Sequence, residues 1–136
     1  GFTDVTSRLE QMIVLDALIA NEDRHWGNFG ALRNSESLEF IGLAPVFDNG
    51  NSLGYKAASV MRNRNADVSV AFNKTHTLEL KHVSSAMKVD WDGIMNHCME
   101  IVEHRYNQMV EPEFGMDRAH MISQFIQERA KKLKTF

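Results

Sequence analysis

Apolar residues near the N-terminus recur at spacings of three and four positions. These residues are Val5, Leu9, Met12, Ile13, Leu15, Ala17, Ile19 and Ala20. Such spacing places side chains on one face of a helix, so it predicts a helix over 3–21. Two starts are compatible with the sequence: Ser7 and Glu10 have capping-box spacing, whereas Thr3 or Asp4 would cap a slightly earlier start.

The pattern then changes to two short apolar runs, 29–32 and 38–43, separated by turn-forming residues at 33–37. Runs of this length around a turn predict a small two-stranded hairpin. Polar loops rich in Asn and Gly flank it at 21–28 and 44–54, and Pro45 is expected to end the second strand. The hairpin therefore separates two loops that carry most of the polar side chains of this region.

The C-terminal half is predicted to be helical. Asp90 is expected to cap a helix whose stripe is formed by Ile94, Cys98, Ile101, Val102 and Met109. Residues 111–115 interrupt the pattern, and a last amphipathic helix follows, ending in lysines near 131–134 that suit the negative end of the helix dipole. Residues 78–87 give a weaker helical pattern. The predicted fold class is mainly α with a small β-hairpin, in a single domain over 1–136.

The composition of the chain disfavours nucleic-acid-binding, membrane and secreted proteins. The chain has 136 residues, is 43% hydrophobic and 24% charged, and has a net charge of −3, a balance that disfavours a nucleic-acid-binding surface. We expect no direct nucleic-acid binding, no membrane segment and no secretory signal. Cys98 is the single cysteine, which fits a reducing compartment, and we expect a cytoplasmic protein. Because the first residue is Gly rather than Met, we expect a piece of a longer chain.

The two polar loops carry a set of oxygen-bearing side chains, Asp23, Asn28 and Asp48. Carboxylate and amide oxygens suit Mg²⁺, which usually completes its coordination with water and substrate phosphates. Asn28 lies five positions after Asp23, the same interval that separates the catalytic Asp and the metal-binding Asn of protein kinases. Asp48 follows Phe47 and precedes Gly50 by two, which is similar to the Asp-Phe-Gly metal loop. These residues predict phosphoryl transfer.

The segments 18–29 and 43–48 read LIANEDRHWGNF and LAPVFD. They resemble the catalytic core of HipA-type serine/threonine kinases, the toxin kinases of bacterial toxin–antitoxin pairs. The Asp-Arg-His-x-x-Asn core also resembles that of phosphatidylinositol kinases. The resemblance covers residues 15 to about 53, and the helical remainder is compatible with the C-terminal lobe of a protein-kinase-like fold.

This resemblance implies ATP- and Mg²⁺-dependent phosphoryl transfer to a Ser or Thr hydroxyl of a protein substrate. Asp23 would be the catalytic aspartate, and Asn28 and Asp48 would hold Mg²⁺. His25, Asn28, Phe47 and Asp48 would contact the nucleotide. An antitoxin-like DNA-binding protein is the implied partner. No Gly-rich loop or strand-borne lysine precedes Asp23, so we expect the N-terminal lobe to lie outside these residues and this chain alone to have little activity.

Other interpretations stay open. The same core fits a lipid or small-molecule kinase, and the loops also fit a non-catalytic helical interaction module, because Asn, Asp and Gly populate turns in any protein. Arg24 either neutralises nearby carboxylates, docks a phosphorylated loop or forms a structural ion pair. Asp16, on the apolar helix, is a candidate to bond to the loop backbone and brace Asp23.

Overall fold

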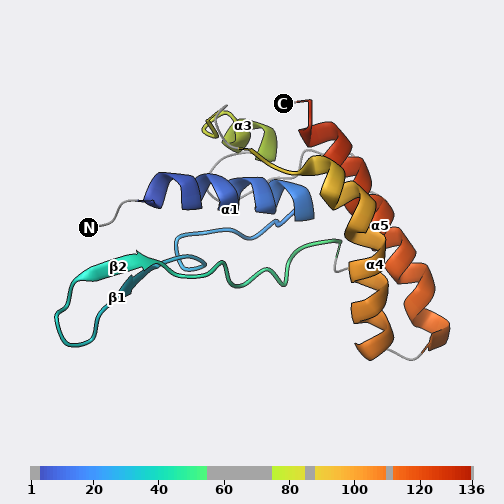
Figure 1. Ribbon diagram of the computed structural model, residues 1–136, viewed down its shortest axis with the longest axis horizontal. Helices are drawn as coiled ribbons and strands as arrows, with labels where there is room; N and C mark the ends of the chain where they lie inside the picture. The colour runs from blue at the N-terminus through green and yellow to red at the C-terminus, as the bar shows by residue number, and fades with distance from the viewer. Residues whose placement is uncertain (1–3, 55–74, 85–87, 110–111, 136) are drawn as a thin grey trace. The chain divides into compact units, whose positions relative to one another are not determined.

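The computed structural model describes residues 4–54, 75–84, 88–109 and 112–135 (Figure 1). Its elements are α1 (Val5–Ile19), β1 (Ala31–Arg33), β2 (Phe40–Leu43), α3 (His76–Leu80), α4 (Trp91–Met109) and α5 (Pro112–Leu133). The predicted fold class, mainly α with one hairpin, is confirmed. The described residues fall into two compact units, one with residues 4–52 and 75–84 and one with residues 53–54, 88–109 and 112–135.

Helix α1 begins and ends inside the predicted 3–21 range. Its N-cap residue is Asp4, so the earlier of the two starts is right, although the Asp4 side chain makes no capping hydrogen bond. The predicted capping box is wrong, because Ser7 lies within the helix and Glu10 bonds elsewhere. At the other end Ala20 adopts a left-handed conformation with φ of 50°, which turns the chain out of the helix.

Strands β1 and β2 form the predicted antiparallel hairpin (Figure 1). Each strand begins two residues later than its predicted apolar run, and β1 extends to Arg33, which was predicted to lie in the turn. Ala31 pairs with Leu43, and the register shifts after Leu32. In the connecting turn, the side-chain oxygen of Asn34 accepts hydrogen bonds from the backbone N–H groups of residues 36 and 37 at 2.8 and 2.9 Å. Both strands carry exposed apolar side chains, so the hairpin is held by its ladder and turn rather than by a core of its own.

Helix α3 packs against α1 and belongs to the same unit. The side chain of Thr75 caps it by accepting from the Leu78 N–H at 3.4 Å. Just beyond α3, the N–H and hydroxyl of Ser84 both bond to the Glu10 carboxylate, at 3.0 and 3.2 Å. The weak helical prediction over 78–87 is thus shifted toward the N-terminus, and its residues 85–87 lie outside the described part of the chain.

Helices α4 and α5 pack side by side and form the second unit (Figure 1). Asp90 caps α4 as predicted, since its Oδ1 accepts from the Gly93 N–H at 2.8 Å. The interruption predicted at 111–115 is shorter in the structure, because α4 ends at Met109 and α5 already begins at Pro112. Proline suits the first position of a helix, where its missing N–H has no partner to lose.

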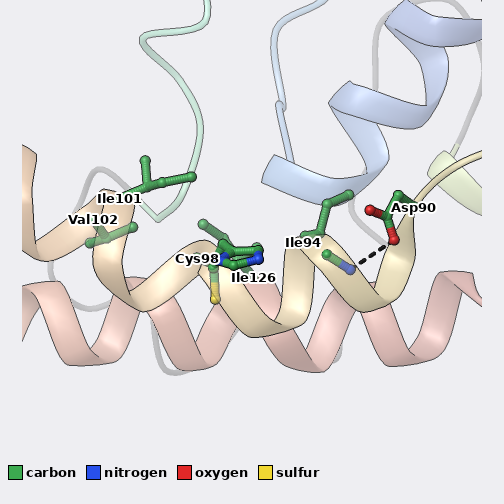
Figure 2. A pocket seen from close by; sticks show the side chains of 8 residues that line it. Asp90, Ile94, Cys98, Ile101, Val102 and Ile126 are labelled. Atoms are coloured by element: carbon green, nitrogen blue, oxygen red, sulfur yellow. Dashed lines mark hydrogen bonds between the residues drawn. The ribbon is translucent and has the colours of Figure 1, made fainter.

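The apolar stripe of α4 lines a shallow groove of about 440 Å³ together with Ile126 of α5 (Figure 2). Cys98 is buried in the stripe and its thiol lies 3.2 Å from the Ser123 hydroxyl. Ile101 lines the same groove but is 62% exposed, so the stripe is not buried along its whole length. Among the described residues, no helix is both long and apolar enough to cross a bilayer.

Candidate active site

A single buried arginine joins the two polar loops. The Arg24 guanidinium is fully buried, and all five of its N–H donors are used. Nη1 donates to the backbone oxygens of Asn28 and Phe47 at 2.6 and 2.8 Å, and Nη2 donates to the Asn49 side chain at 2.5 Å. The Arg24 side chain therefore bonds to both the loop after α1 and the loop after β2.

The charge of Arg24 is balanced by Asp16, on the last turns of α1. The Asp16 carboxylate accepts from Nε and Nη2 of Arg24 at 2.8 and 2.9 Å, and it is 1% exposed. A buried pair of this kind is stable only when its geometry is good and its remaining polar atoms are bonded. Both conditions hold here, since Asn21 also donates to Asp16 at 2.9 Å. Of the roles considered for Arg24, the structure shows the structural ion pair.

In the sequence, Asp23 lies between Asp16 and Arg24, on the loop after α1, and it is partly buried. Its backbone N–H donates to Asn21 Oδ1 at 3.1 Å, and its backbone oxygen accepts from Asn28 Nδ2 at 2.7 Å. Its carboxylate oxygen Oδ2 accepts from Asn51 Nδ2 at 2.8 Å. The Asp16 carboxylate bonds to the side chains of Asn21 and Arg24 and not, as predicted, to the loop backbone, so it is linked to Asp23 only indirectly, through Asn21.

Asn28 is 4% exposed and its amide has a fixed orientation. Because Nδ2 donates to the Asp23 backbone, the side-chain oxygen Oδ1 is the atom available to accept or to bind a cation. Its backbone N–H donates to the His25 carbonyl at 2.9 Å, and its own carbonyl is held by Arg24. The structure thus brings Asp23 and Asn28 into direct contact.

Asp48 lies on the second loop, between the two residues that Arg24 holds. The Phe47 carbonyl precedes it and the Asn49 side chain follows it. Asp48 is exposed and adopts a left-handed conformation with φ of 55°, which aspartate tolerates better than most residues. Its carboxylate is therefore on a loop segment fixed to Asn28 through a common partner, Arg24.

His25 and Trp26 are both exposed. Nδ1 of His25 accepts from the Gly27 N–H at 3.0 Å, so Nε2 is the ring nitrogen that this contact leaves available to a ligand. The Trp26 ring is 81% exposed and lies 5.8 Å from the Phe29 ring, so it is not the buried packing residue that its size suggests. Phe47, another of the predicted nucleotide contacts, is 44% exposed.

The donor set fits a hard divalent cation. Asn28 Oδ1 and the Asp48 carboxylate are oxygen ligands of the kind Mg²⁺ prefers, and few protein ligands are needed when phosphates supply the rest. Within the described part of the chain, no group of three or more His, Cys, Asp or Glu side chains is arranged to hold a metal ion. Sequence reasoning missed Asn49 and Asn51, whose only signal was the Asn-rich composition of the second loop.

One curated protein shares part of this sequence. The chain is 48% identical over 50 residues to "Serine/threonine-protein kinase CtkA" from Helicobacter pylori (strain J99 / ATCC 700824). Over this stretch, the chain is similar to a protein kinase. The match covers 37% of the chain and only 15% of the kinase. No family model matches the chain, and no solved structure matches it.

Proposed function

We propose that this chain carries the catalytic and metal-binding residues of an ATP- and Mg²⁺-dependent serine/threonine kinase of HipA-like type, as part of its C-terminal lobe. The observation that supports the proposal best is the Arg24 guanidinium, which fastens the loop of Asp23 and Asn28 to the loop of Asp48. The partial similarity to a serine/threonine kinase supports the same reaction.

In this proposal Asp23 accepts the proton of a Ser or Thr hydroxyl. The hydroxyl oxygen forms a bond to the γ-phosphorus of ATP, the bond to the bridging β–γ oxygen breaks, and ADP leaves. Asn28 Oδ1 and Asp48 would hold Mg²⁺, which when bound offsets the negative charge of the phosphates. His25 Nε2 and the Phe47 side chain are exposed on the same two loops, where they would contact the nucleotide.

The proposal is tested by a kinase assay on the protein as its gene encodes it, with radiolabelled ATP, Mg²⁺ and a library of Ser- and Thr-containing peptides. We expect labelled peptide, and a loss of kcat of about 10²- to 10⁴-fold in Asp23→Asn, because general-base catalysis contributes that much. Asp48→Asn should raise the Mg²⁺ concentration needed for half-maximal rate. Asp4→Asn is the matched control, since Asp4 is exposed and far from the loops in sequence.

The alternatives give different results in the same experiment. Transfer of label to phosphatidylinositol vesicles or to a small molecule, with none to peptide, would identify a different acceptor. An absence of Mg²⁺-dependent nucleotide binding by the wild-type protein would favour the interaction module. The antitoxin-like DNA-binding partner and the cytoplasmic location stay predictions from the sequence resemblance and the cysteine content.

A further inference from the structure

Asn51 reaches from the second loop to Asp23 in the first. Its side-chain Nδ2 donates to Asp23 Oδ2 at 2.8 Å, and its backbone oxygen accepts from the Glu22 N–H at 3.1 Å. Asn51 is half-buried, three positions after Asp48. It therefore connects the proposed catalytic carboxylate directly to the loop that carries a proposed metal ligand.

We propose that Asn51 is a positioning residue that sets the orientation of the Asp23 carboxylate for proton transfer. This inference rests on the proposed function. The backbone of Asp23 is already fixed on both sides, through Asn21 and Asn28, so rotation of its side chain is the freedom that remains. The hydrogen bond from Asn51 to Oδ2 restrains that rotation.

The arrangement assigns different tasks to the two oxygens of the carboxylate. Oδ2 is held by the Asn51 amide, whereas Oδ1 receives no hydrogen bond from the described residues. Oδ1 is thus the atom that would accept the proton of the substrate hydroxyl. An amide is a suitable partner for this purpose, because it donates a hydrogen bond without bringing the positive charge of Lys or Arg.

The side chain of Asn51 is not needed to hold the two loops together. The backbone oxygen of residue 51 bonds to Glu22, and Arg24 bonds to Phe47 and Asn49. A substitution that changes only the side chain keeps all of these contacts. Asn51→Asp retains the shape of the residue and replaces the donor with an acceptor that repels the Asp23 carboxylate.

The test is steady-state kinetics of Asn51→Asp and Asn51→Ala in the protein as its gene encodes it, with Asn34→Asp as control. Asn34 is exposed in the hairpin turn and uses its side-chain oxygen as an acceptor, which Asp retains. We expect kcat to fall about 10- to 100-fold in both Asn51 variants, the scale of a small misplacement of a catalytic group. The KM for ATP should stay near its wild-type value, and Asn34→Asp should match wild type.

A spectroscopic measurement adds a readout independent of turnover. In a ¹⁵N–¹H spectrum, the side-chain amide signals of Asn51 are identified by their loss in Asn51→Asp. They should shift in Asp23→Ala, which removes their acceptor. Unchanged signals would contradict the proposed contact.

The outcomes separate this inference from the proposed function. Wild-type kcat in Asp23→Asn would refute the role of Asp23 itself. If Asp23→Asn is inactive but Asn51→Asp has the wild-type kcat, or has a lower kcat/KM only because its KM is raised, the role of Asn51 is refuted. The proposed kinase function is then still supported. If Asn51→Asp fails to fold, Asn51→Ala decides in the same way, because it introduces no charge.

Discussion

Replacing Arg24 with lysine should destabilise the unit that contains α1 and the hairpin, even though the positive charge beside Asp16 is kept. The guanidinium makes five hydrogen bonds, and a lysine ammonium has three donors, so Arg24→Lys loses at least two of them. Each hydrogen bond contributes about 1 kcal/mol or somewhat more when one partner is charged. We expect the free energy of unfolding to fall by about 2–3 kcal/mol.

The measurement is urea-induced unfolding followed by circular dichroism, with hydrogen exchange of peptides from α1 and residues 21–28 as the local readout. Exchange should accelerate in this unit, because the loss is confined to it. Arg33→Lys is the matched control, since Arg33 is exposed on the hairpin, and its effect should stay within about 0.5 kcal/mol.

A double-mutant cycle that combines Arg24→Lys with Asp16→Asn tests whether the contact between the two side chains contributes to stability. Asp16→Asn leaves a buried guanidinium without its counter-charge, at a cost of about 3–5 kcal/mol. Because both changes disrupt the same pair, the double variant should lose less than the sum of the two single losses, by about 1–3 kcal/mol. Additive losses, within about 0.5 kcal/mol, would show that the Arg24–Asp16 contact does not carry the stability assigned to it.

Substitutions at three further positions test other contacts by the same unfolding measurement. Asp90→Ala removes the N-cap of α4 and should cost about 1 kcal/mol, and no change would refute a capping role. Glu10→Ala removes the acceptor of the Ser84 N–H and hydroxyl and should cost about 1 kcal/mol, because Ser84 is exposed and water can replace the carboxylate, whereas Glu10→Gln, which keeps one acceptor, should cost less. Lys134→Met removes an exposed ion pair with Asp92 at 2.7 Å and should change the free energy of unfolding by no more than about 1 kcal/mol; a larger loss would contradict its treatment as a surface pair.

Local patterns in the sequence were sufficient to predict α1, the hairpin and α4, whereas α3 was placed too far toward the C-terminus. The three- and four-residue spacing located α1, the turn formers at 33–37 located the hairpin, and Asp90 located the start of α4. Each of these residue patterns lies within, or within a few positions of, the helix or hairpin that it predicts. The error at Pro112 has the same origin, because proline is compatible with either a break or the first residue of a helix.

The contacts that organise the candidate site were not visible in the sequence. Arg24 finds partners 23 and 25 positions away, and Asn51 bonds to a carboxylate 28 positions away. No periodicity specifies which carbonyl a guanidinium will meet across two loops. Asp16 alone indicated such a contact in the sequence. A carboxylate on an apolar helix face requires a polar or charged partner when it is buried.

The link between Glu10 and Ser84 also has a consequence for how the chain is made. The two residues are 74 positions apart, and α3 reaches α1 only after the hairpin and the segment that follows it have been synthesised. During translation, α1 and both loops leave the ribosome before the element that packs against them. Until residue 84 emerges, Glu10 lacks this partner and the side of α1 that α3 covers is exposed to water.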